Sequence, residues 1–419
     1  MIRRGIEASL RDAMADTPVV LVHGARQTGK STLAKTYAQS VDGATYLKLD
    51  DATVLAAAVG DPAGFLSQFT GPVVLDEVQR APGLFLAIKL LVDRDRRPGR
   101  FLLTGSADVL LVPALSDSLA GRMEILTLWP FAGVELSGDI WSFVDMLFSD
   151  NPLPKAAALE PRPLLLQRIA RGGFPEALAR TAARRREAWF GSYITTILQR
   201  DVREASNIEN LTMLPRLLAL LATRSCGLLN QAELSRALGM PLSTLRRYLT
   251  LLEMTFLVRQ TPAWSANLGK RLTKSPKATL CDTGLMSFLL GIDPSRGIPD
   301  HLTGPLVENH AVMEMTKHLG WSATRAALYH FRDQTGQEVD ILLEDAMGRL
   351  VGIEVKAATG VSKEDFRHLQ LLRKQTGARF HRGVVLHTGT ETVAFDGQLS
   401  AFPLGALTPA PRSGTDNLR

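Results

Sequence analysis

An apolar run followed by a glycine-rich loop near the amino terminus constrains this chain most strongly. The apolar residues 19–22 precede the sequence His-Gly-Ala-Arg-Gln-Thr-Gly-Lys-Ser, which ends at Ser31. Glycines in such a loop let the backbone N–H groups converge on one point, and a helix that begins at the loop adds its positive end. The pattern G-x-x-x-x-G-K-S directly after a strand therefore predicts a phosphate-binding loop in an α/β domain.

The loop predicts a site for ATP with Mg²⁺. Lys30 is expected to neutralise the β- and γ-phosphates, and the hydroxyl of Ser31 is expected to bind Mg²⁺. An accidental match in a glycine-rich turn would lack the apolar strand before the loop and the helix after it. The residues expected to surround the phosphates are Gly24, Ala25, Arg26, Gln27, Thr28, Gly29, Lys30, Ser31 and Thr32.

A second short apolar run, 73–75, ends in Asp76 and Glu77. Parallel sheets bind ligands at the carboxyl ends of their strands, where these acids would lie. Asp76 is expected to hold Mg²⁺ through water, and Glu77 to orient or deprotonate the water that attacks the γ-phosphate. A third strand, 101–104, leads to Ser106, which either senses the γ-phosphate or the attacking water or simply ends the strand. The alternative for the acids is a strand end followed by solvated side chains.

Composition limits the class of protein. The 419 residues, 45% hydrophobic and 21% charged, are enough for two or three globular domains. The formal charge of +6 is a mild basic excess that favours polyanionic partners. The two cysteines, Cys226 and Cys281, are too few for a disulfide framework or a zinc site, which favours a reducing cytoplasm. Arginines interrupt the most hydrophobic segment, 214–229, so no contact with a membrane is expected.

Apolar runs alternate with helical stretches up to about residue 135, which predicts a parallel sheet wrapped by helices. Further on, residues 229–249 have the layout of a helix-turn-helix, with one helix ending at Gly239 and a second beginning at Ser243 as its N-cap. The segment after it favours a winged variant. Exposed side chains of the second helix would meet DNA, or the module packs against a neighbouring domain without touching DNA. The candidate DNA-binding residues are Ser243, Thr244, Arg246 and Arg247.

The C-terminal third is expected to follow the order helix, three strands, helix and two strands. The first helix, Pro305 to Leu319, carries Glu308, and the second and third strands carry Asp340, Glu354 and Lys356. Acids and a lysine at adjacent strand ends predict a metal site for phosphodiester cleavage. Asp340 and Glu354 would bind Mg²⁺, and Lys356 would orient the attacking hydroxide or stabilise the transition state. The alternative is an ion-paired, solvated strand.

This arrangement of about a hundred residues resembles the PD-(D/E)xK, or restriction-endonuclease-like, nuclease fold. The resemblance puts Glu308 in the place of the upstream helix acid and so implies that it is a further ligand of Mg²⁺. The arrangement departs from that pattern where Glu338-Val339-Asp340 replaces the usual Pro-Asp pair. Taken together, the motifs of the whole chain resemble a widespread prokaryotic family of AAA-type ATPases with a nuclease-like C-terminal domain of unassigned function. The motifs that carry the resemblance are residues 24–31, 75–79, 103–106, 119–122, 172–176, 199–202 and 338–356.

The resemblance implies an α/β fold made of an AAA-type core, a helical lid, a winged helix and a nuclease-like domain. Arg122 looks like the arginine finger of the family, which would complete the active site of a neighbouring copy and so implies a homo-oligomer; alternatively it caps a helix. The expected limits are 1–150 for the P-loop ATPase core, 151–212 for the lid or linker, 213–300 for the winged helix, 301–407 for the nuclease-like domain and 408–419 for a flexible tail.

The hypothesis that follows is a cytoplasmic ATPase that hydrolyses ATP and acts on DNA, with a Mg²⁺-dependent DNA nuclease activity as a further hypothesis for the C-terminal domain. The alternative is a regulatory nucleotide switch. In that case the winged helix and an inactive nuclease fold would serve only as surfaces for protein interaction.

Overall fold

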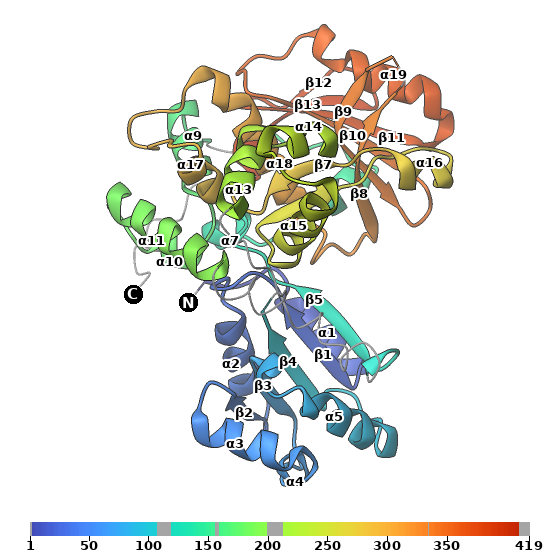
Figure 1. The fold of residues 1–419 in the computed structure, drawn as a ribbon. Coiled ribbons are helices and arrows are strands. Elements are labelled where there is room, and N and C mark those ends of the chain that lie inside the picture. The colour runs from blue at the N-terminus through green and yellow to red at the C-terminus, as the bar shows by residue number, and fades with distance from the viewer. Residues whose placement is uncertain (1, 107–118, 156–158, 199–212, 334, 410–419) are drawn as a thin grey trace.

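The computed structural model describes residues 2–106, 119–155, 159–198, 213–333 and 335–409. Two lobes are visible in Figure 1, one built on a five-stranded sheet and a larger one built on a six-stranded sheet. We call the described residues up to Leu128 the N-terminal lobe and those from Trp129 onward the C-terminal lobe. Among the described residues, no helix combines the length and the apolar character needed to cross a membrane.

The N-terminal lobe contains the expected parallel sheet, with the strand order β2-β3-β4-β1-β5. Strand β1 pairs in parallel with both β4 and β5, and β3 lies between β2 and β4. The glycine-rich loop follows β1, and Asp76 ends β3, so both lie at the edge of the sheet where the strands have their carboxyl ends. The strands are β1 (Val19–His23), β2 (Thr45–Lys48), β3 (Val73–Asp76), β4 (Phe101–Gly105) and β5 (Met123–Thr127).

Both faces of this sheet are buried, because alternate residues of a strand point to opposite sides. Val19 and Leu21 of β1 pack with α4 and α5, whereas Val20 and Val22 pack with α1 and α2. The prediction of a sheet wrapped by helices is therefore confirmed. The helices are α1 (Glu7–Asp16), α2 (Lys30–Ser40), α3 (Ala52–Gly60), α4 (Pro62–Ser67), the 3₁₀ helix η1 (Val78–Arg80) and α5 (Gly83–Arg94).

The C-terminal sheet has the strand order β12-β13-β11-β10-β9-β8, in which β10 is antiparallel to β9 and parallel to β11. Ile341 and Leu343 of β9 share a core with α18, while Leu342 packs with α19 on the other face. The predicted order of helix, three strands, helix and strands is found. The elements are α18 (Asp300–His318), β8 (Ala326–Arg332), β9 (Glu338–Asp345), β10 (Leu350–Lys356), η5 (Lys363–Phe366), α19 (Arg367–Thr376), η6 (Gly377–Arg379), β11 (Phe380–His387), β12 (Val393–Ala394), β13 (Leu399–Pro403) and η7 (Leu404–Ala406).

Two of the expected helix starts are wrong. Helix α18 begins at Asp300 and contains Pro305 in its interior, where the proline gives up the helical hydrogen bond to the carbonyl oxygen of His301. Helix α15 begins at Leu242 after Pro241, and Ser243 lies inside it without acting as an N-cap. The end of α14 at Gly239 is as predicted, since this glycine has a φ of 62°.

The winged helix consists of three helices and a two-stranded antiparallel hairpin. The residues that join the two strands of the hairpin lie along the C-terminal sheet, where Ala263 forms a parallel bridge with His330 of β8. The hairpin thus contacts the C-terminal sheet. The elements are α13 (Leu214–Thr223), α14 (Gln231–Leu238), α15 (Leu242–Met254), β6 (Val258–Thr261), α16 (Leu268–Thr273) and β7 (Lys277–Leu280).

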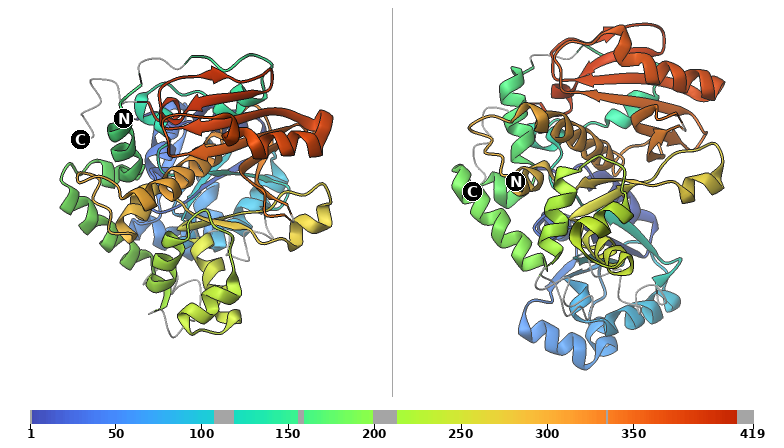
Figure 2. Two further views of the ribbon diagram at one scale, coloured as in Figure 1. Left: turned by 90° about the horizontal axis from the view of Figure 1, so that it is seen from above. Right: turned by 45° about the horizontal axis from the view of Figure 1, so that its top comes forward.

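The larger of the two hydrophobic cores of the C-terminal lobe crosses the predicted limits at residues 212 and 300, and the second core lies on the other face of the sheet. Helix α18 packs against both β7 of the hairpin and β10 of the sheet, and Figure 2 shows it between these two parts. Residues 133–148, expected in the first domain, also belong to this lobe, where α8 packs against α18. The remaining helices are α7 (Gly133–Ser137), α8 (Phe143–Phe148), α9 (Arg162–Arg171), α10 (Pro175–Leu178), α11 (Ala183–Thr196) and α17 (Thr283–Leu289).

The chain after η7 remains packed for at least two more residues. The hydroxyl of Thr408 lies 2.6 Å from Nε2 of His310, and Thr408 is buried. The rest of the predicted flexible tail, residues 410–419, lies outside the described residues, as does the motif at 199–202.

Candidate functional site

The two glycines of the loop are required by its geometry. Gly24 has a φ of 151°, and a Cβ at this position would lie 2.2 Å from the carbonyl oxygen of Leu128. Gly29 has a φ of 97° and stands directly before α2. Both conformations exclude ordinary side chains. The loop folds over Lys30, which is buried and donates hydrogen bonds to the carbonyl oxygens of Gly24 (3.0 Å) and Ala25 (2.8 Å).

Asp76 is fully buried and is held by three hydroxyl groups. Ser31 Oγ donates to its Oδ1 at 3.0 Å, Thr104 Oγ1 donates to the same oxygen, and Tyr46 donates to Oδ2 at 2.7 Å. Burial and the hydrogen bond to Asp76 raise the pKa of Tyr46 above its usual value. A carboxylate beside a serine hydroxyl is a ligand pair that suits Mg²⁺, so Ser31 and Asp76 fit the metal predicted for this site.

Glu77 is held next to Ser106 by a glutamine that the sequence analysis did not assign. The backbone of Glu77 is left-handed, with a φ of 61°, and its N–H donates to Thr104 Oγ1 at 3.1 Å. Gln79 Nε2 donates both to Glu77 Oε2 and to Ser106 Oγ, the latter at 3.0 Å. Left-handed conformations of residues other than glycine are costly and are concentrated at functional sites. The only signal for Gln79 in the sequence is its place two residues after Glu77.

A cavity of about 180 Å³ opens beside the loop. One wall combines Arg4 with Phe131: the guanidinium lies 4.5 Å from the ring centroid and donates to the carbonyl oxygens of Thr28 (2.6 Å) and Trp129 (2.7 Å). A cavity with apolar walls, in which an arginine lies over an aromatic ring, suits a planar heteroaromatic ligand. The lining residues include Ile2, Arg4, Thr32, Leu33, Phe131 and Pro175, of which only Thr32 was predicted from the sequence.

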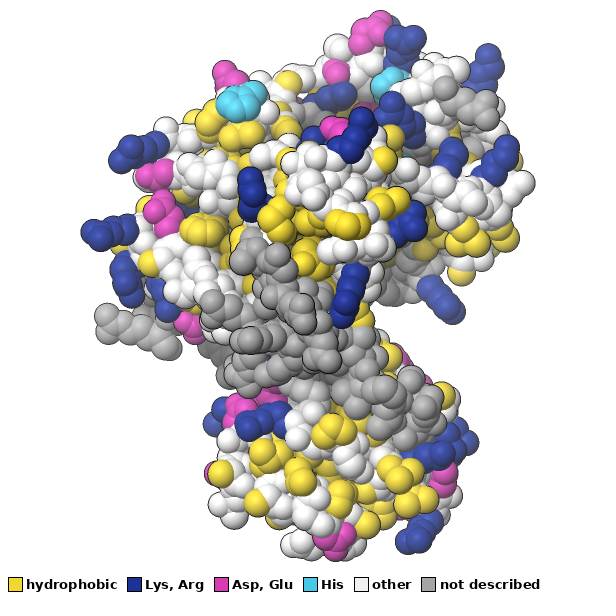
Figure 3. Space-filling model, in the orientation of Figure 1, with side chains coloured by type: hydrophobic (Ala, Val, Ile, Leu, Met, Phe, Trp, Pro, Cys, Tyr) yellow, Lys and Arg dark blue, Asp and Glu magenta, His cyan; other side chains and the backbone are white. Residues whose placement is uncertain are grey.

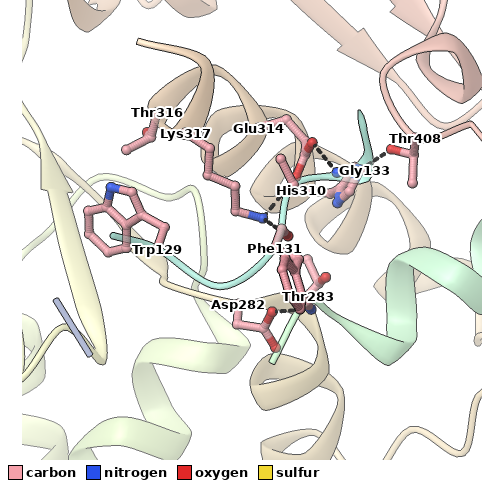
Figure 4. A network of polar contacts seen from close by, with 12 residues as sticks. Trp129, Phe131, Gly133, Asp282, Thr283, His310, Glu314, Thr316, Lys317 and Thr408 are labelled. Atoms are coloured by element: carbon pink, nitrogen blue, oxygen red, sulfur yellow. Dashed lines mark hydrogen bonds and ion pairs between the residues drawn. The ribbon is translucent and has the colours of Figure 1, made fainter. Parts of the chain in front are cut away.

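A buried polar network connects the wall of this cavity to α18 (Figure 4). Lys317 Nζ donates to the carbonyl oxygen of Phe131 at 2.9 Å and lies 2.8 Å from Glu314 Oε1. Glu314 Oε2 accepts a hydrogen bond of 2.9 Å from the N–H of Gly133. Helix α18 therefore fixes residues 131–133 of the cavity wall.

A second connection runs through the Gly-Gly-Phe-Pro-Glu motif at 172–176. Gly173 accepts a hydrogen bond from the N–H of Phe131 (2.8 Å) and donates its own N–H to Asp282 Oδ2 (2.6 Å). The other oxygen of Asp282 caps the first turn of α17. Burial raises the pKa of Asp282 against the effect of these hydrogen bonds. The motif thus connects the cavity, through Pro175, to the part of the chain that follows β7.

Arg122 lies at the opposite end of the sheet from the loop. It precedes β5, whose first residue pairs with Val19, the first residue of β1. Its Nε forms an ion pair of 2.6 Å with Asp93, and its Nη1 donates to the carbonyl oxygen of Ala120. It cannot contact the phosphate loop of its own chain, because four residues of a strand span about 13 Å. Its role as an arginine finger stays a prediction about a second copy.

The predicted DNA contacts lie together on α15. Ser243, Arg246 and Arg247 are exposed and Thr244 is half-buried. Arg246 Nε donates to Gln231 at 3.0 Å. Figure 3 shows Lys and Arg side chains spread over this face of the C-terminal lobe rather than gathered in one patch.

The acids of the C-terminal lobe converge on a lysine of the hairpin, which the sequence analysis did not consider. Lys277 Nζ lies 2.8 Å from Glu308 Oε1, 2.5 Å from Glu338 Oε1 and 3.6 Å from Asp340 Oδ1. The Lys277 side chain is only 4% exposed. Burial lowers the pKa of Lys277, but the surrounding carboxylates outweigh it and raise the pKa above its usual value.

Glu354 and Lys356 form a separate pair on β10. Glu354 Oε2 lies 3.6 Å from Lys356 Nζ, and Oε1 lies 3.4 Å from Nδ1 of His368 on α19. Burial, with the charge of Asp340, raises the pKa of Glu354 to about 9. Burial and Asp340 also raise the pKa of Glu308 to about 7, although Lys277 lowers it.

The residues of this cluster do not fit the predicted Mg²⁺. An octahedral ion needs several oxygen ligands at about 2.1 Å, whereas Glu308 and Glu338 direct their oxygens at an ammonium. A divalent ion among these carboxylates would be repelled by that ammonium, which already lies between Glu308 and Glu338. Within the described part of the chain, no group of three or more His, Cys, Asp or Glu side chains has a geometry that could hold a metal ion.

The loop, the parallel sheet and the acids that end β3 together define a P-loop protein of the AAA class. The model of an AAA domain matches residues 16–137. Two models of domains of unknown function match the rest of the chain, DUF8612 at residues 162–296 and DUF4143 at residues 303–407. Neither names a nuclease.

The chain belongs to the same family as two uncharacterized mycobacterial proteins, Rv2008c of Mycobacterium tuberculosis and Mb2031c of Mycobacterium bovis. Each is 36% identical to it over 357 residues, which are 84% of this chain and 74% of the relative. Among solved structures, a variant of RuvB from Thermotoga maritima is similar with 18% identity and a TM-score of 0.31, over 61% of this chain and 89% of that chain.

Proposed function

We propose that this protein binds and hydrolyses ATP in the N-terminal lobe. The observation that carries the proposal is the convergence at one sheet edge of Lys30, the Ser31–Asp76 pair and the Glu77–Gln79–Ser106 chain. Lys30 binds the β- and γ-phosphates, and Ser31 and Asp76 hold Mg²⁺, which supplies charge neutralisation when bound. The adjacent cavity accepts the base, where it stacks near Arg4 and Phe131.

Glu77 is the proposed base of the reaction. Its carboxylate lies at the end of β3, and Gln79 fixes it relative to Ser106, which orients the attacking water. The left-handed backbone of Glu77 supports this assignment, because strain of this kind is retained where it positions a functional group.

The nucleotide state is proposed to reach the C-terminal lobe through the cavity wall. Phe131 and Gly133 lie between the cavity and α18, and Gly173 lies between the cavity and α17. A base that displaces Phe131 would alter hydrogen bonds that hold both helices. This is a proposal about coupling, and it requires two arrangements of residues 131–133.

DNA is the proposed partner, bound through the exposed face of α15 without cleavage. Arg246 and Arg247 can contact phosphates, and Ser243 lies in the first turn of α15, where recognition helices meet base edges. The opposing candidate is a regulatory nucleotide switch with protein partners. It is favoured by one observation: the hairpin of the winged helix is held on the C-terminal sheet of its own chain.

The ATPase proposal is tested by comparing Glu77→Gln with Glu124→Gln. Glu124 is exposed on β5, so its substitution removes the same charge away from the loop. E77Q should bind ATP with unchanged affinity and hydrolyse it at least about 100-fold more slowly, because general-base catalysis contributes about 10²- to 10⁴-fold. E124Q should hydrolyse ATP as the wild type does. Normal turnover by E77Q would assign the base elsewhere.

The DNA proposal is tested by the double variants Arg246→Ala/Arg247→Ala and Arg184→Ala/Arg185→Ala. Both remove two exposed arginines, the second pair from α11, so the net charge is matched. Only the α15 variant should weaken DNA binding and reduce its dependence on salt, since each lost phosphate contact lowers the slope by about 1. Wild-type protein that binds no DNA at low salt, and whose ATPase rate DNA does not change, would favour the switch.

Assembly is proposed through Arg122 of one copy and the loop of the next. Arg122→Ala should lower the ATPase rate at protein concentrations where oligomers form, by about 10³-fold if it acts as an arginine finger. Arg94→Ala, at an exposed position near the end of α5, is the matched control. An R122A enzyme of normal activity would leave Arg122 as a structural partner of Asp93.

A further inference from the structure

The cluster around Lys277 brings together residues from three parts of the chain. Lys277 begins β7 of the hairpin, Glu308 lies on α18, and Glu338 and Asp340 lie on β9. The ammonium contacts the first two carboxylates directly and lies within 4 Å of the third. A lysine that is only 4% exposed needs such partners, because an uncompensated buried charge is strongly unfavourable.

Other contacts leave each carboxylate little freedom to accept another cation. Glu338 also pairs with Arg332 Nη1 at 3.3 Å, through its second oxygen. Asp340 Oδ2 accepts a hydrogen bond of 2.9 Å from the backbone N–H of Val355. Glu308 directs Oε1 at Lys277. Two cations of the chain, Lys277 and Arg332, thus face the three carboxylates.

The backbone of β7 fixes Lys277 in this position. Asn309, the neighbour of Glu308 on α18, exchanges two hydrogen bonds with the backbone of Leu280, of 2.8 and 3.0 Å. The N–H of Cys226 donates to the carbonyl oxygen of Ala278 at 2.7 Å. Strand β7 and helix α18 are thus joined both by Lys277 with Glu308 and by Leu280 with Asn309, so the backbone that carries Lys277 is held against α18.

We propose that the acidic cluster of Glu308, Glu338 and Asp340 is an internal ammonium site, filled by Lys277, that joins the winged-helix hairpin to the C-terminal sheet and keeps divalent metal ions out. The proposal concerns the C-terminal lobe alone and does not depend on ATP hydrolysis. It assigns the cluster to the connection between two parts of the lobe and not to phosphodiester cleavage. In this proposal, Lys356 and Glu354 form an ion pair beside the acidic cluster that Lys277 fills.

The first test measures Mn²⁺ binding to the nucleotide-free, full-length wild type by electron paramagnetic resonance. Any bound Mn²⁺ should be lost in Asp76→Asn, the nucleotide site, and retained in Asp340→Asn. The absence of bound Mn²⁺ in the wild type supports the proposal as well. Bound Mn²⁺ that Asp340→Asn or Glu308→Gln removes would overturn it. This comparison decides the proposal whether or not any variant of Lys277 folds.

The second test compares Lys277→Met with Lys270→Met, which removes an exposed lysine from α16 in the same hairpin. K277M should melt at a lower temperature than the wild type and should bind Mn²⁺ at least tenfold more tightly, and the added Mn²⁺ should raise its melting temperature. K270M should match the wild type in all three respects. A K277M protein that melts like the wild type and gains no Mn²⁺ would contradict the proposal.

Discussion

The two lobes both place acids at strand ends, but they supply the neighbouring groups differently. In the N-terminal lobe, Asp76 is bonded by the hydroxyls of Ser31, Thr104 and Tyr46. In the C-terminal lobe, Glu308 and Glu338 contact the ammonium of Lys277. Neutral hydroxyls leave the charge of a carboxylate available to a metal ion, whereas an ammonium neutralises it. An acid at a strand end therefore indicates a metal site only when its hydrogen-bond partners are uncharged.

The lobes also differ in how their cores are built. The N-terminal sheet has a separate core on each face, and its functional edge remains open beside a cavity. The C-terminal sheet also has a separate core on each face, but one of these two cores continues through the helices and the winged helix. We therefore expect the C-terminal lobe to unfold as one unit, and the connection at residues 131–133 and 173 to decide whether the N-terminal lobe unfolds with it.

The largest expected effect is a loss of ATP binding that concerns the N-terminal lobe alone. Lys30→Ala should weaken ATP binding by about 3–5 kcal/mol, or on the order of 10²- to 10⁴-fold, because it removes the charged partner of the phosphates. Stability of the C-terminal lobe should not change. Titration calorimetry measures the affinity, and Lys35→Ala, exposed on the same helix, is the control. Equal losses in both variants would mean that the loop is not the binding site.

A smaller effect should weaken the connection between the lobes. Gly173→Ala would place a Cβ 2.2 Å from the carbonyl oxygen of Phe131, so the backbone must shift. We expect a loss of up to about 3 kcal/mol in the free energy of unfolding, the range observed for forced overpacking. Denaturant unfolding followed separately in each lobe should then show two transitions. A single transition of unchanged midpoint would remove Gly173 from the connection.

Acid should act on buried histidines in both lobes, and in the C-terminal lobe the raised pKa values of Glu308 and Glu354 oppose the effect. In the C-terminal lobe, burial lowers the pKa of His318 and His330 to about 4 and lowers that of His310 further. In the N-terminal lobe, burial and the charge of Lys30 lower the pKa of His23 to about 4. As the pH falls from about 6.5 towards 4, the unfolded chain takes up protons that the folded chain does not, so stability decreases.

The magnitude at pH 5 is on the order of 2 kcal/mol for each such histidine. Hydrogen exchange at pH 7 and pH 5, corrected for the intrinsic rates, compares the lobes directly. His318→Gln should reduce the loss in the C-terminal lobe, and His301→Gln, at an exposed position of α18, should not. An equal loss of protection in the wild type and in His318→Gln would contradict this assignment.

The smallest expected effect is a gain in stability, whereas Gly173→Ala is expected to cause a loss. Gly304 lies in α18, and a Cβ at this position would meet no atom within 4 Å. Gly304→Ala should stabilise the C-terminal lobe by about 0.5–1 kcal/mol, because alanine loses less backbone entropy in a helix. Thermal unfolding measures the gain. Gly304→Ala also serves as the matched control for Gly173→Ala. A loss of stability of similar size in both variants would argue against a steric cause at Gly173.

The sequence by itself determined the features that depend on neighbours in the chain. The loop from Gly24 to Ser31, the acids Asp76 and Glu77, and the order of strands and helices all follow from spacing within single strand-loop-helix units, where local rules apply. The same reasoning gave the place of the winged helix and of its Gly239 cap. These features needed no knowledge of distant contacts.

Only the tertiary structure decided which groups complete each site. Arg4 and Glu135, whose side chains join the cavity wall to α7, are 131 residues apart, and Lys277 reaches Glu308 across 31 residues. Spacing carries no signal for such pairs, because a lysine at the start of a hairpin strand reads the same whether it faces water or a cluster of acids. The identity of the cation beside an acid depends on packing between elements. In our proposal, the packing of β7 against α18 and β9 places an ammonium where the sequence predicted a metal ion.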